Sequence, residues 1–148
     1  MLTSIRLLAI ALPLHFAWEM LQMPAFTRLP ESLLVATAWC AVATLGDGAL
    51  ILTVFFIAAA LFADRRWFAP PRRRRYATAV VIGMLLNVTV ESLLARGFGL
   101  WGYAAWHPIV PVVNVGVLAV LQPVVLFPLT FRLLARWERK SPVTRRRG

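Results

Sequence analysis

Three carboxylic acids lie inside long apolar runs of this 148-residue chain, namely Glu19, Asp47 and Glu91. An ionisable side chain at the centre of a bilayer costs on the order of 2.5–3.5 kcal/mol on insertion scales, so such residues normally face a protein interior or a wet cavity. Two carboxyl groups that lie close together can share a proton, which suits general acid/base chemistry or a proton relay. We therefore predict that Glu19 and Glu91 form an acid/base pair, and that Asp47 and His15 tune their protonation.

Polar side chains recur at helical spacing in the same apolar runs. His15, Glu19 and Gln22 stand at positions i, i+4 and i+7, which places them on one face of a helix. Asn87 precedes Glu91 by one turn in a later run. Amides in membrane helices can also serve only as hydrogen-bonded glue between helices, which is the competing interpretation. The amides expected to bind substrate beside the acids are Gln22, Asn87, Asn114 and Gln122.

An aromatic, glycine-rich segment over residues 97–108 follows the third apolar run. Its three glycines permit tight backbone paths, while its aromatic rings supply rigid apolar surface. We predict that this segment forms a lid over the acidic cluster and contacts a hydrophobic ligand. The alternative is an anchor at the membrane interface. The residues assigned to the lid are Trp101, Tyr103, Trp106 and His107.

Nitrogen and oxygen ligands for a metal ion are present in the same cluster, because His15 and Glu19 are four residues apart. That spacing is common by chance, and we predict no metal site from it. The lone cysteine, Cys40, excludes an internal disulfide and any multi-cysteine metal site. The sequence leaves any cofactor undetermined.

The elements that must position these residues follow from composition and run length. The chain is 60% hydrophobic and 15% charged, whereas an ordinary soluble domain has about 25% charged residues. Apolar runs of about 20 residues are long enough to cross a bilayer as helices. We predict an all-α integral membrane protein, a single domain over residues 1–148, with four transmembrane helices in two hairpins. Their expected limits are residues 5–23, 33–62, 77–94 and 112–134.

The second apolar run has 30 residues, which is about half as long again as the hydrocarbon core requires. Gly46, Asp47 and Gly48 lie near its middle, where two glycines loosen a helix around a residue that hydrocarbon rejects. The span can therefore tilt strongly, project beyond the bilayer or be interrupted, and an interruption would fall at this point. A break near the membrane midplane is typical of transporters.

Basic residues are distributed unevenly around these spans. All but two of the 16 Lys and Arg residues fall on one side, in the basic loop 64–76, in the tail 136–148 and beside the first and last spans. The positive-inside rule then places both termini and the central loop in the cytoplasm of a multi-pass protein of the cell inner membrane. Trp67, Phe68, Tyr76 and Trp137 are expected to form an aromatic belt at the inner interface.

A net charge of +10 raises the question of nucleic-acid binding. Only Arg28 and Arg96 lie on the outer side, and the other basic residues cluster beside membrane spans. Arginines in that position set topology and contact anionic lipid head groups, at about 1 kcal/mol each, so we predict no nucleic-acid partner. The arginines expected to contact head groups are Arg72, Arg73, Arg74 and Arg75.

Two classes of function are consistent with these features. The preferred prediction is a membrane-embedded enzyme or binding protein that acts on a hydrophobic, lipid-like substrate by acid/base chemistry. The alternative is a proton- or cation-coupled transporter or channel subunit, which could work as a homo-oligomer because four helices leave little room for a full transport machine. A third interpretation is an accessory subunit of a membrane complex, in which the polar residues only hold helices together.

Overall fold

The structure is a computed structural model that describes residues 2–28 and 30–140. Within these residues the chain is mostly helical, as predicted, and four helical segments are long and apolar enough to span a membrane. These segments indicate a multi-pass membrane protein. The four long helices are α1 (Leu2–Gln22), α2 (Leu33–Leu61), α3 (Arg73–Ser92) and α4 (Val117–Lys140).

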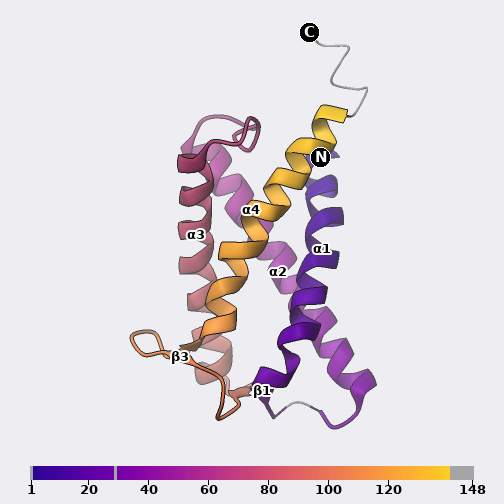
Figure 1. Ribbon diagram of the computed structural model, residues 1–148, viewed down its shortest axis with the longest axis vertical. Coiled ribbons are helices and arrows are strands. Elements are labelled where there is room, and N and C mark those ends of the chain that lie inside the picture. The colour runs from indigo at the N-terminus through magenta and orange to yellow at the C-terminus, as the bar shows by residue number, and fades with distance from the viewer. Residues whose placement is uncertain (1, 29, 141–148) are drawn as a thin grey trace.

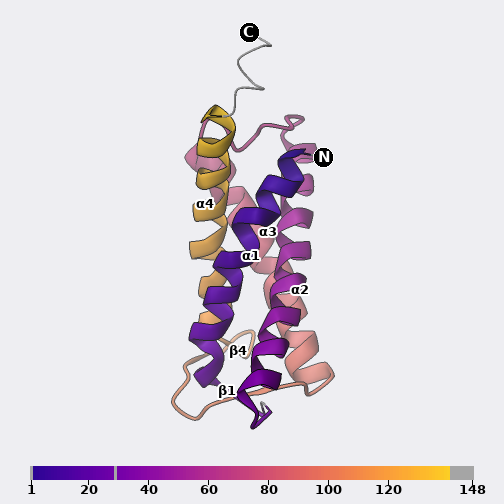
Figure 2. The same cartoon turned by 90° about the vertical axis from the view of Figure 1, so that its right-hand side faces the viewer.

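The helices form a bundle in which each packs mainly against two others (Figures 1 and 2). α1 contacts α2 and α4, and α3 contacts the same two helices. In both views the start of α1, the end of α4 and the segment between α2 and α3 lie at one end, which we call the basic end. The opposite end, which we call the loop end, carries the short strands and the remaining connections.

Short elements tie the connections together at the loop end. They are η1 (Met23–Ala25), β1 (Phe26–Thr27), η2 (Leu93–Gly97), β2 (Gly102–Tyr103), β3 (Ile109–Val110) and β4 (Val115–Gly116). β1 pairs antiparallel with β2, with Phe26 opposite Tyr103, and so joins the connection after α1 to the one after α3. β3 and β4 form a second ladder directly before α4. The bundle is therefore helical with two small strand pairs at one end, which the apolar runs did not predict.

The fourth helix begins at Val117, so the prediction that it starts at residue 112 is wrong. Pro108 and Pro111 lack backbone N–H groups and disfavour helical geometry in the residues before them. The chain forms the β3–β4 pair there instead. Asn114 lies between these strands with a φ of 52°, a left-handed conformation that asparagine tolerates better than most residues. Asn114 therefore lies outside α4, whereas Gln122 lies within it.

The second helix runs without interruption through Gly46, Asp47 and Gly48, so the alternative of a break at this point is excluded. A Cβ atom at Gly48 would lie 2.9 Å from Leu12 Cδ2 of α1. Gly48 therefore allows α1 and α2 to approach closely, which is a frequent use of small residues between membrane helices. Packing against α1 offsets the cost of glycine in a helix, about 1 kcal/mol relative to alanine.

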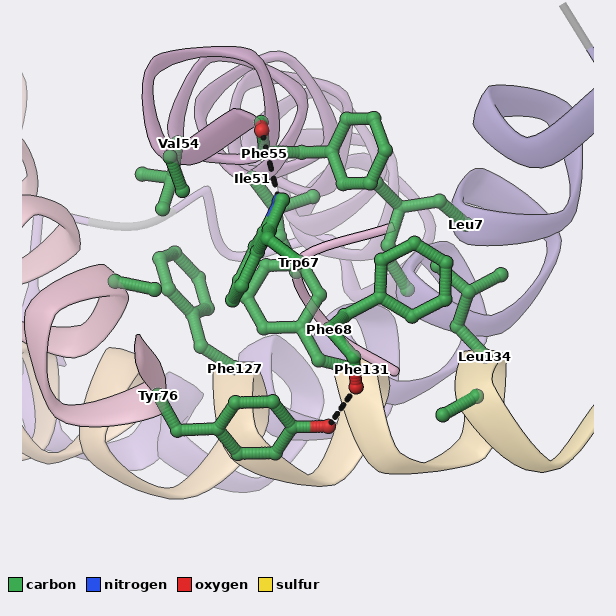
Figure 3. Close-up of a cluster of buried hydrophobic side chains, with 14 residues drawn as sticks. Leu7, Ile51, Val54, Phe55, Trp67, Phe68, Tyr76, Phe127, Phe131 and Leu134 are labelled. Atoms are coloured by element: carbon green, nitrogen blue, oxygen red, sulfur yellow. Dashed lines mark hydrogen bonds between the residues drawn. The ribbon is translucent and has the colours of Figure 1, made fainter. Parts of the chain in front are cut away.

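An aromatic core fills the half of the bundle next to the basic end (Figure 3). Trp67 and Phe68 are both fully buried in it, so their prediction as an interfacial belt is wrong. The segment between α2 and α3 folds back into the bundle, where Trp67 Nε1 donates to the Phe55 carbonyl at 3.1 Å. Tyr76 is also buried, and its hydroxyl donates to the Phe68 carbonyl at 3.0 Å. Satisfying these polar atoms inside the bundle allows large rings to be buried.

An ion pair fastens the segment between α2 and α3 to the start of α3. The third helix begins at Arg73, four residues earlier than predicted, so Arg75 lies in its first turn rather than in a loop. Arg75 Nη1 donates to Asp64 Oδ2 at 2.6 Å, and the Arg66 backbone N–H donates to Asp64 Oδ1 at 2.8 Å. The hydrogen bond from Arg75, followed by the one from Arg66, lowers the pKa of Asp64 below its ordinary value.

We expect Asp64→Asn to reduce the loss of stability on acidification. Because the folded-state pKa of Asp64 lies below its ordinary value of 3.8, its stabilisation is present above that value and is lost as pH falls through the folded-state pKa. Thermal unfolding of the detergent-solubilised protein between pH 6 and about pH 2.5 measures the difference. The substitution Glu31→Gln, at an exposed acid of the loop end, serves as control. Parallel pH profiles for wild type and Asp64→Asn would contradict the prediction.

Candidate functional site

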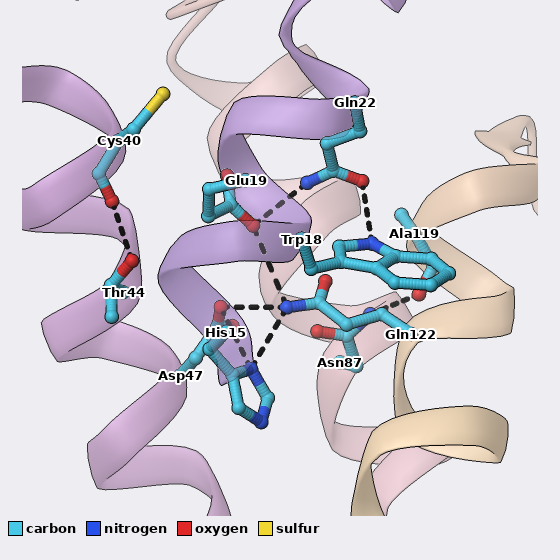
Figure 4. Close-up of polar contacts among 10 residues, drawn as sticks. All are labelled: His15, Trp18, Glu19, Gln22, Cys40, Thr44, Asp47, Asn87, Ala119 and Gln122. Carbon is cyan, nitrogen blue, oxygen red and sulfur yellow. Dashed lines mark hydrogen bonds and ion pairs between the residues drawn. The ribbon is translucent and has the colours of Figure 1, made fainter. Parts of the chain in front are cut away.

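A polar network joins α1, α2 and α4 in the half of the bundle toward the loop end (Figure 4). Gln122 Nε2 lies 2.6 Å from Asp47 Oδ2 and 3.0 Å from His15 Nδ1. His15 Nδ1 is itself 3.1 Å from the same oxygen of Asp47. Glu19 Oε1 lies 3.5 Å from Gln122 Nε2 and extends the network along α1. Four predicted site residues therefore meet, although they are separated by up to 107 positions in the chain.

The number of hydrogens in the network determines which atoms donate. Gln122 Nε2 has two hydrogens but three neighbouring acceptor atoms. The donors are satisfied when His15 Nδ1 donates to Asp47, and Gln122 donates to Asp47 and Glu19. His15 Nε2 is then an unprotonated nitrogen, and it is buried without a hydrogen-bond partner in the described part of the chain. A histidine oriented by a carboxylate, with its other nitrogen free, is the arrangement of a general base.

Glu19 receives further hydrogen bonds from its own helix. Gln22 Nε2 donates to Glu19 Oε1 at 2.7 Å, and Trp18 Nε1 donates to Gln22 Oε1 at 2.9 Å. Figure 4 shows the three side chains together beside Gln122. Trp18 was not predicted as a site residue, although it shares the helical face of His15 and Gln22. Its role follows from the indole N–H, which needs an acceptor in an apolar surrounding.

Glu91 lies in a second cluster, which ties α3 to the loop end. Its Oε1 accepts hydrogen bonds from Trp101 Nε1 at 3.0 Å and from the Tyr103 hydroxyl at 2.7 Å. Burial, together with the bond to Glu91, raises the pKa of Tyr103 above its ordinary value, so the phenol remains a donor. Trp101 and Tyr103 thus contact one of the predicted acids, Glu91, directly.

The predicted pair of Glu19 and Glu91 is not joined by a direct hydrogen bond among the residues that the structure describes. Each carboxyl group has its own donors, from α1 and α4 for Glu19 and from the loop end for Glu91. The three acids therefore lie in two hydrogen-bonded clusters, with Asp47 and Glu19 in one and Glu91 in the other.

The remaining amides have different surroundings. Asn87 is buried and its Nδ2 donates to the Ala119 carbonyl at 2.7 Å, which holds α3 against α4. Asn114 is exposed and lies outside the polar network. Trp106 is 65% exposed and makes an edge contact with the ring of His107. Asn87 is therefore placed as a helix-joining residue, and Trp106 is the most exposed member of the predicted lid.

A cavity of about 420 Å³ opens at the loop end. Trp101 and Tyr103, the donors to Glu91, line it together with His107 and Asn114. The His107 ring stacks on Tyr103 with centroids 5.5 Å apart, and it is only 4% exposed. Burial lowers the pKa of His107, so the ring is neutral at pH 7. The volume lies within the range of small-molecule sites, about 300–1,000 Å³.

The histidine and the acids of this cluster are also residue types that bind metal ions. Within residues 2–28 and 30–140, no group of three or more His, Cys, Asp and Glu side chains is positioned to hold a metal ion. His15, Glu19 and Asp47 instead use their polar atoms on one another and on amides. The geometry favours proton transfer over metal coordination.

Comparison of the chain with protein-family models, curated proteins and solved structures finds no match. Conclusions about function therefore depend on the side-chain geometry described above.

Proposed function

We propose that this protein binds a hydrophobic, lipid-like substrate at the loop end of its transmembrane bundle and acts on it by acid/base chemistry. One observation carries the proposal: protonatable side chains of α1 and α2 meet at Gln122 of α4 in the half of the bundle toward the loop end, where a cavity also opens. The cavity adjoins the cluster of Glu91, because Trp101 and Tyr103 both line the cavity and donate to that carboxyl group. Concave sites with few polar groups are the usual setting for such ligands.

The roles follow from the hydrogen bonds. His15 Nε2 is the candidate general base, and Asp47 orients the ring through Nδ1. Gln122 bridges Asp47 to Glu19 by donating a hydrogen bond to each acid. Glu91, held by Trp101 and Tyr103 at the cavity, is the candidate acid nearest to a bound substrate. A positioned acid or base contributes about 10²- to 10⁴-fold to a reaction rate.

A proton or cation pathway through one subunit has less support. Toward the basic end, the described interior is the aromatic and aliphatic core, and the buried Thr130 hydroxyl has no hydrogen-bond partner there. Ions and protons need polar groups or water along their path. Glu138 is a buried carboxylate in this half and accepts a hydrogen bond from Thr3 Oγ1 at 2.7 Å, but most of the buried side chains around it are aromatic or aliphatic. The continuous α2 also removes the midplane break that would favour transport. Transport would thus require an oligomer with a path between subunits.

Reconstituted liposomes distinguish the two functions. Under our proposal, wild type and Asp47→Asn show the same proton and cation fluxes as protein-free vesicles. A flux that wild type carries and Asp47→Asn loses would favour transport, because Asp47 lies at the centre of the network.

We also propose that the basic end faces the cytoplasm of the cell inner membrane and contacts anionic head groups. Arg72 and Arg73 line a cavity of about 360 Å³ between α3 and α4, with Arg132 on its other wall. Val80 and other apolar residues line the same space, which suits an acyl chain below a charged head group. Arg75 contributes less to this contact, because it is paired with Asp64.

The test of the proposed function is the lipid that the protein retains. Wild type and Glu91→Gln are extracted with their surrounding lipid, and the retained molecules are identified by mass spectrometry. We expect one lipid class to be enriched over the bulk membrane, with substrate accumulating in Glu91→Gln and product appearing only with wild type. Glu31→Gln, at an exposed acid, is the control and should match wild type. Retained lipid equal to the bulk membrane in all three proteins would refute the proposal.

A further inference from the structure

The loop-end cavity contains two positive charges that the acid/base chemistry does not use. Arg28 and Arg96, the two basic residues outside the basic side of the sequence, both line it. They come from distant segments, since Arg28 directly follows β1 and Arg96 lies in η2. The pairing of β1 with β2 brings these segments to the same end of the bundle. Neither arginine forms an ion pair with a carboxylate among the described residues.

Both arginines are exposed and line the same cavity, so both can reach an anion that enters it. Arg28 Nη1 makes a long hydrogen bond of 3.4 Å to the Gly99 carbonyl, which leaves most of its five N–H groups available. Arginine binds carboxylates and phosphates through paired N–H donors, and this is the recognition for which it is better suited than lysine. The charge in the cavity is thus complementary to an anionic group.

His107 is a second, independent observation that points to a ligand at this cavity. Its ring lines the cavity and is 4% exposed, yet neither ring nitrogen has a hydrogen-bond partner in the described chain. Buried polar atoms are nearly always hydrogen-bonded, so two unpaired nitrogens at a cavity indicate a missing partner. A neutral imidazole offers one donor and one acceptor, which matches an oxygen-rich head group.

We propose that the loop-end cavity binds the anionic head group, a carboxylate or a phosphate, of the lipid-like substrate. Arg28 and Arg96 bind its oxygens, and His107 adds a hydrogen bond from the side of Tyr103. This inference rests on the proposed function and specifies its substrate class. Trp101 and Tyr103 line the head-group site and donate to Glu91. A substrate whose head group is bound there therefore has its acyl chain held in a fixed position relative to the Glu91 carboxyl group.

Fluorescence quenching by brominated amphiphiles tests the inference on the full-length protein in uncharged detergent. The probes are a brominated fatty acid and the fatty alcohol with the same chain, and Trp101 at the cavity is the reporter. The chain has six tryptophans, so the quenching that is lost in the Trp101→Phe variant gives the part of the signal that comes from Trp101. We expect the acid to bind at least about tenfold more tightly than the alcohol, because charge-assisted hydrogen bonds distinguish the two head groups.

The double substitution of Arg28→Gln and Arg96→Gln should abolish this preference, whereas lysine at both positions should preserve part of it. Arg139→Gln, at an exposed arginine of α4 near the basic end, is the matched control and should keep the full preference. Equal affinity for acid and alcohol, or an unchanged preference in the double variant, overturns the head-group assignment. Inorganic phosphate and a second, unbrominated fatty acid are also compared as competitors. If phosphate displaces the brominated fatty acid at the same concentration as the competing fatty acid does, the ligand is a free anion and the head-group assignment is overturned.

The outcomes separate this inference from the proposed function. If acid and alcohol quench Trp101 equally, the head-group assignment fails while a lipid-binding site at the loop end remains. If neither probe quenches Trp101 and the retained lipid equals the bulk membrane, both proposals fail.

Discussion

Glu91→Gln is expected to lower turnover of the retained lipid by about 10²- to 10⁴-fold while the bundle stays folded. Glutamine has the shape of glutamate, and its Oε1 can still accept the hydrogen bonds from Trp101 and Tyr103. Only the charge and the transferable proton are removed. Turnover is measured by mass spectrometry of substrate and product in isolated membranes, and folding by thermal unfolding of the same preparation.

Two further variants make the result specific. Glu19→Gln should act in the same direction, since glutamine there can still accept from Gln22 Nε2 and the network geometry is retained. Glu31→Gln makes the same chemical change at an exposed position and should have no effect. Wild-type turnover in both Glu19→Gln and Glu91→Gln would disprove the site. Loss of expression or of helix packing would instead favour the accessory-subunit interpretation, in which the acids act as glue.

Trp67→Ala is expected to reduce the free energy of unfolding by about 3–5 kcal/mol, the range for removing a large buried aromatic side chain. Trp67 is fully buried and its ring lies 4.7 Å from that of Phe131, centroid to centroid. The substitution leaves a cavity among several rings and deprives the Phe55 carbonyl of its indole donor. Unfolding of the protein by a denaturing detergent in mixed micelles measures the change.

Trp39→Ala provides the matched control for this experiment. Trp39 is a tryptophan of α2 that is 46% exposed on the outside of the bundle, so its removal creates no internal cavity. We expect less than about 1 kcal/mol of destabilisation there, as for substitutions away from packed sites. Equal destabilisation by the two substitutions would show that Trp67 acts as an interfacial anchor, as the sequence had indicated, rather than as core.

The sequence by itself determined the properties that depend on local composition and period. Four apolar runs predicted four long helices, although the starts expected at residues 77 and 112 and the end expected at residue 134 lie four to six residues from the observed limits. The shared face of His15, Glu19 and Gln22 also followed from the sequence, because residues three and four apart on a helix are neighbours wherever the helix packs. These predictions needed no knowledge of other elements.

Only the tertiary structure decided which of these groups meet. Gln122 contacts Asp47 and His15 because α4 packs beside α1, and no local pattern encodes that contact. Likewise Trp67 lies in the core because the segment between α2 and α3 folds inward, although its charged neighbours resemble an interfacial loop. Spacing along one helix specifies a face, whereas the partner of that face depends on the balance of packing across the whole bundle. The candidate chemistry was therefore visible in the residue types, and the division of the acids into two clusters was not.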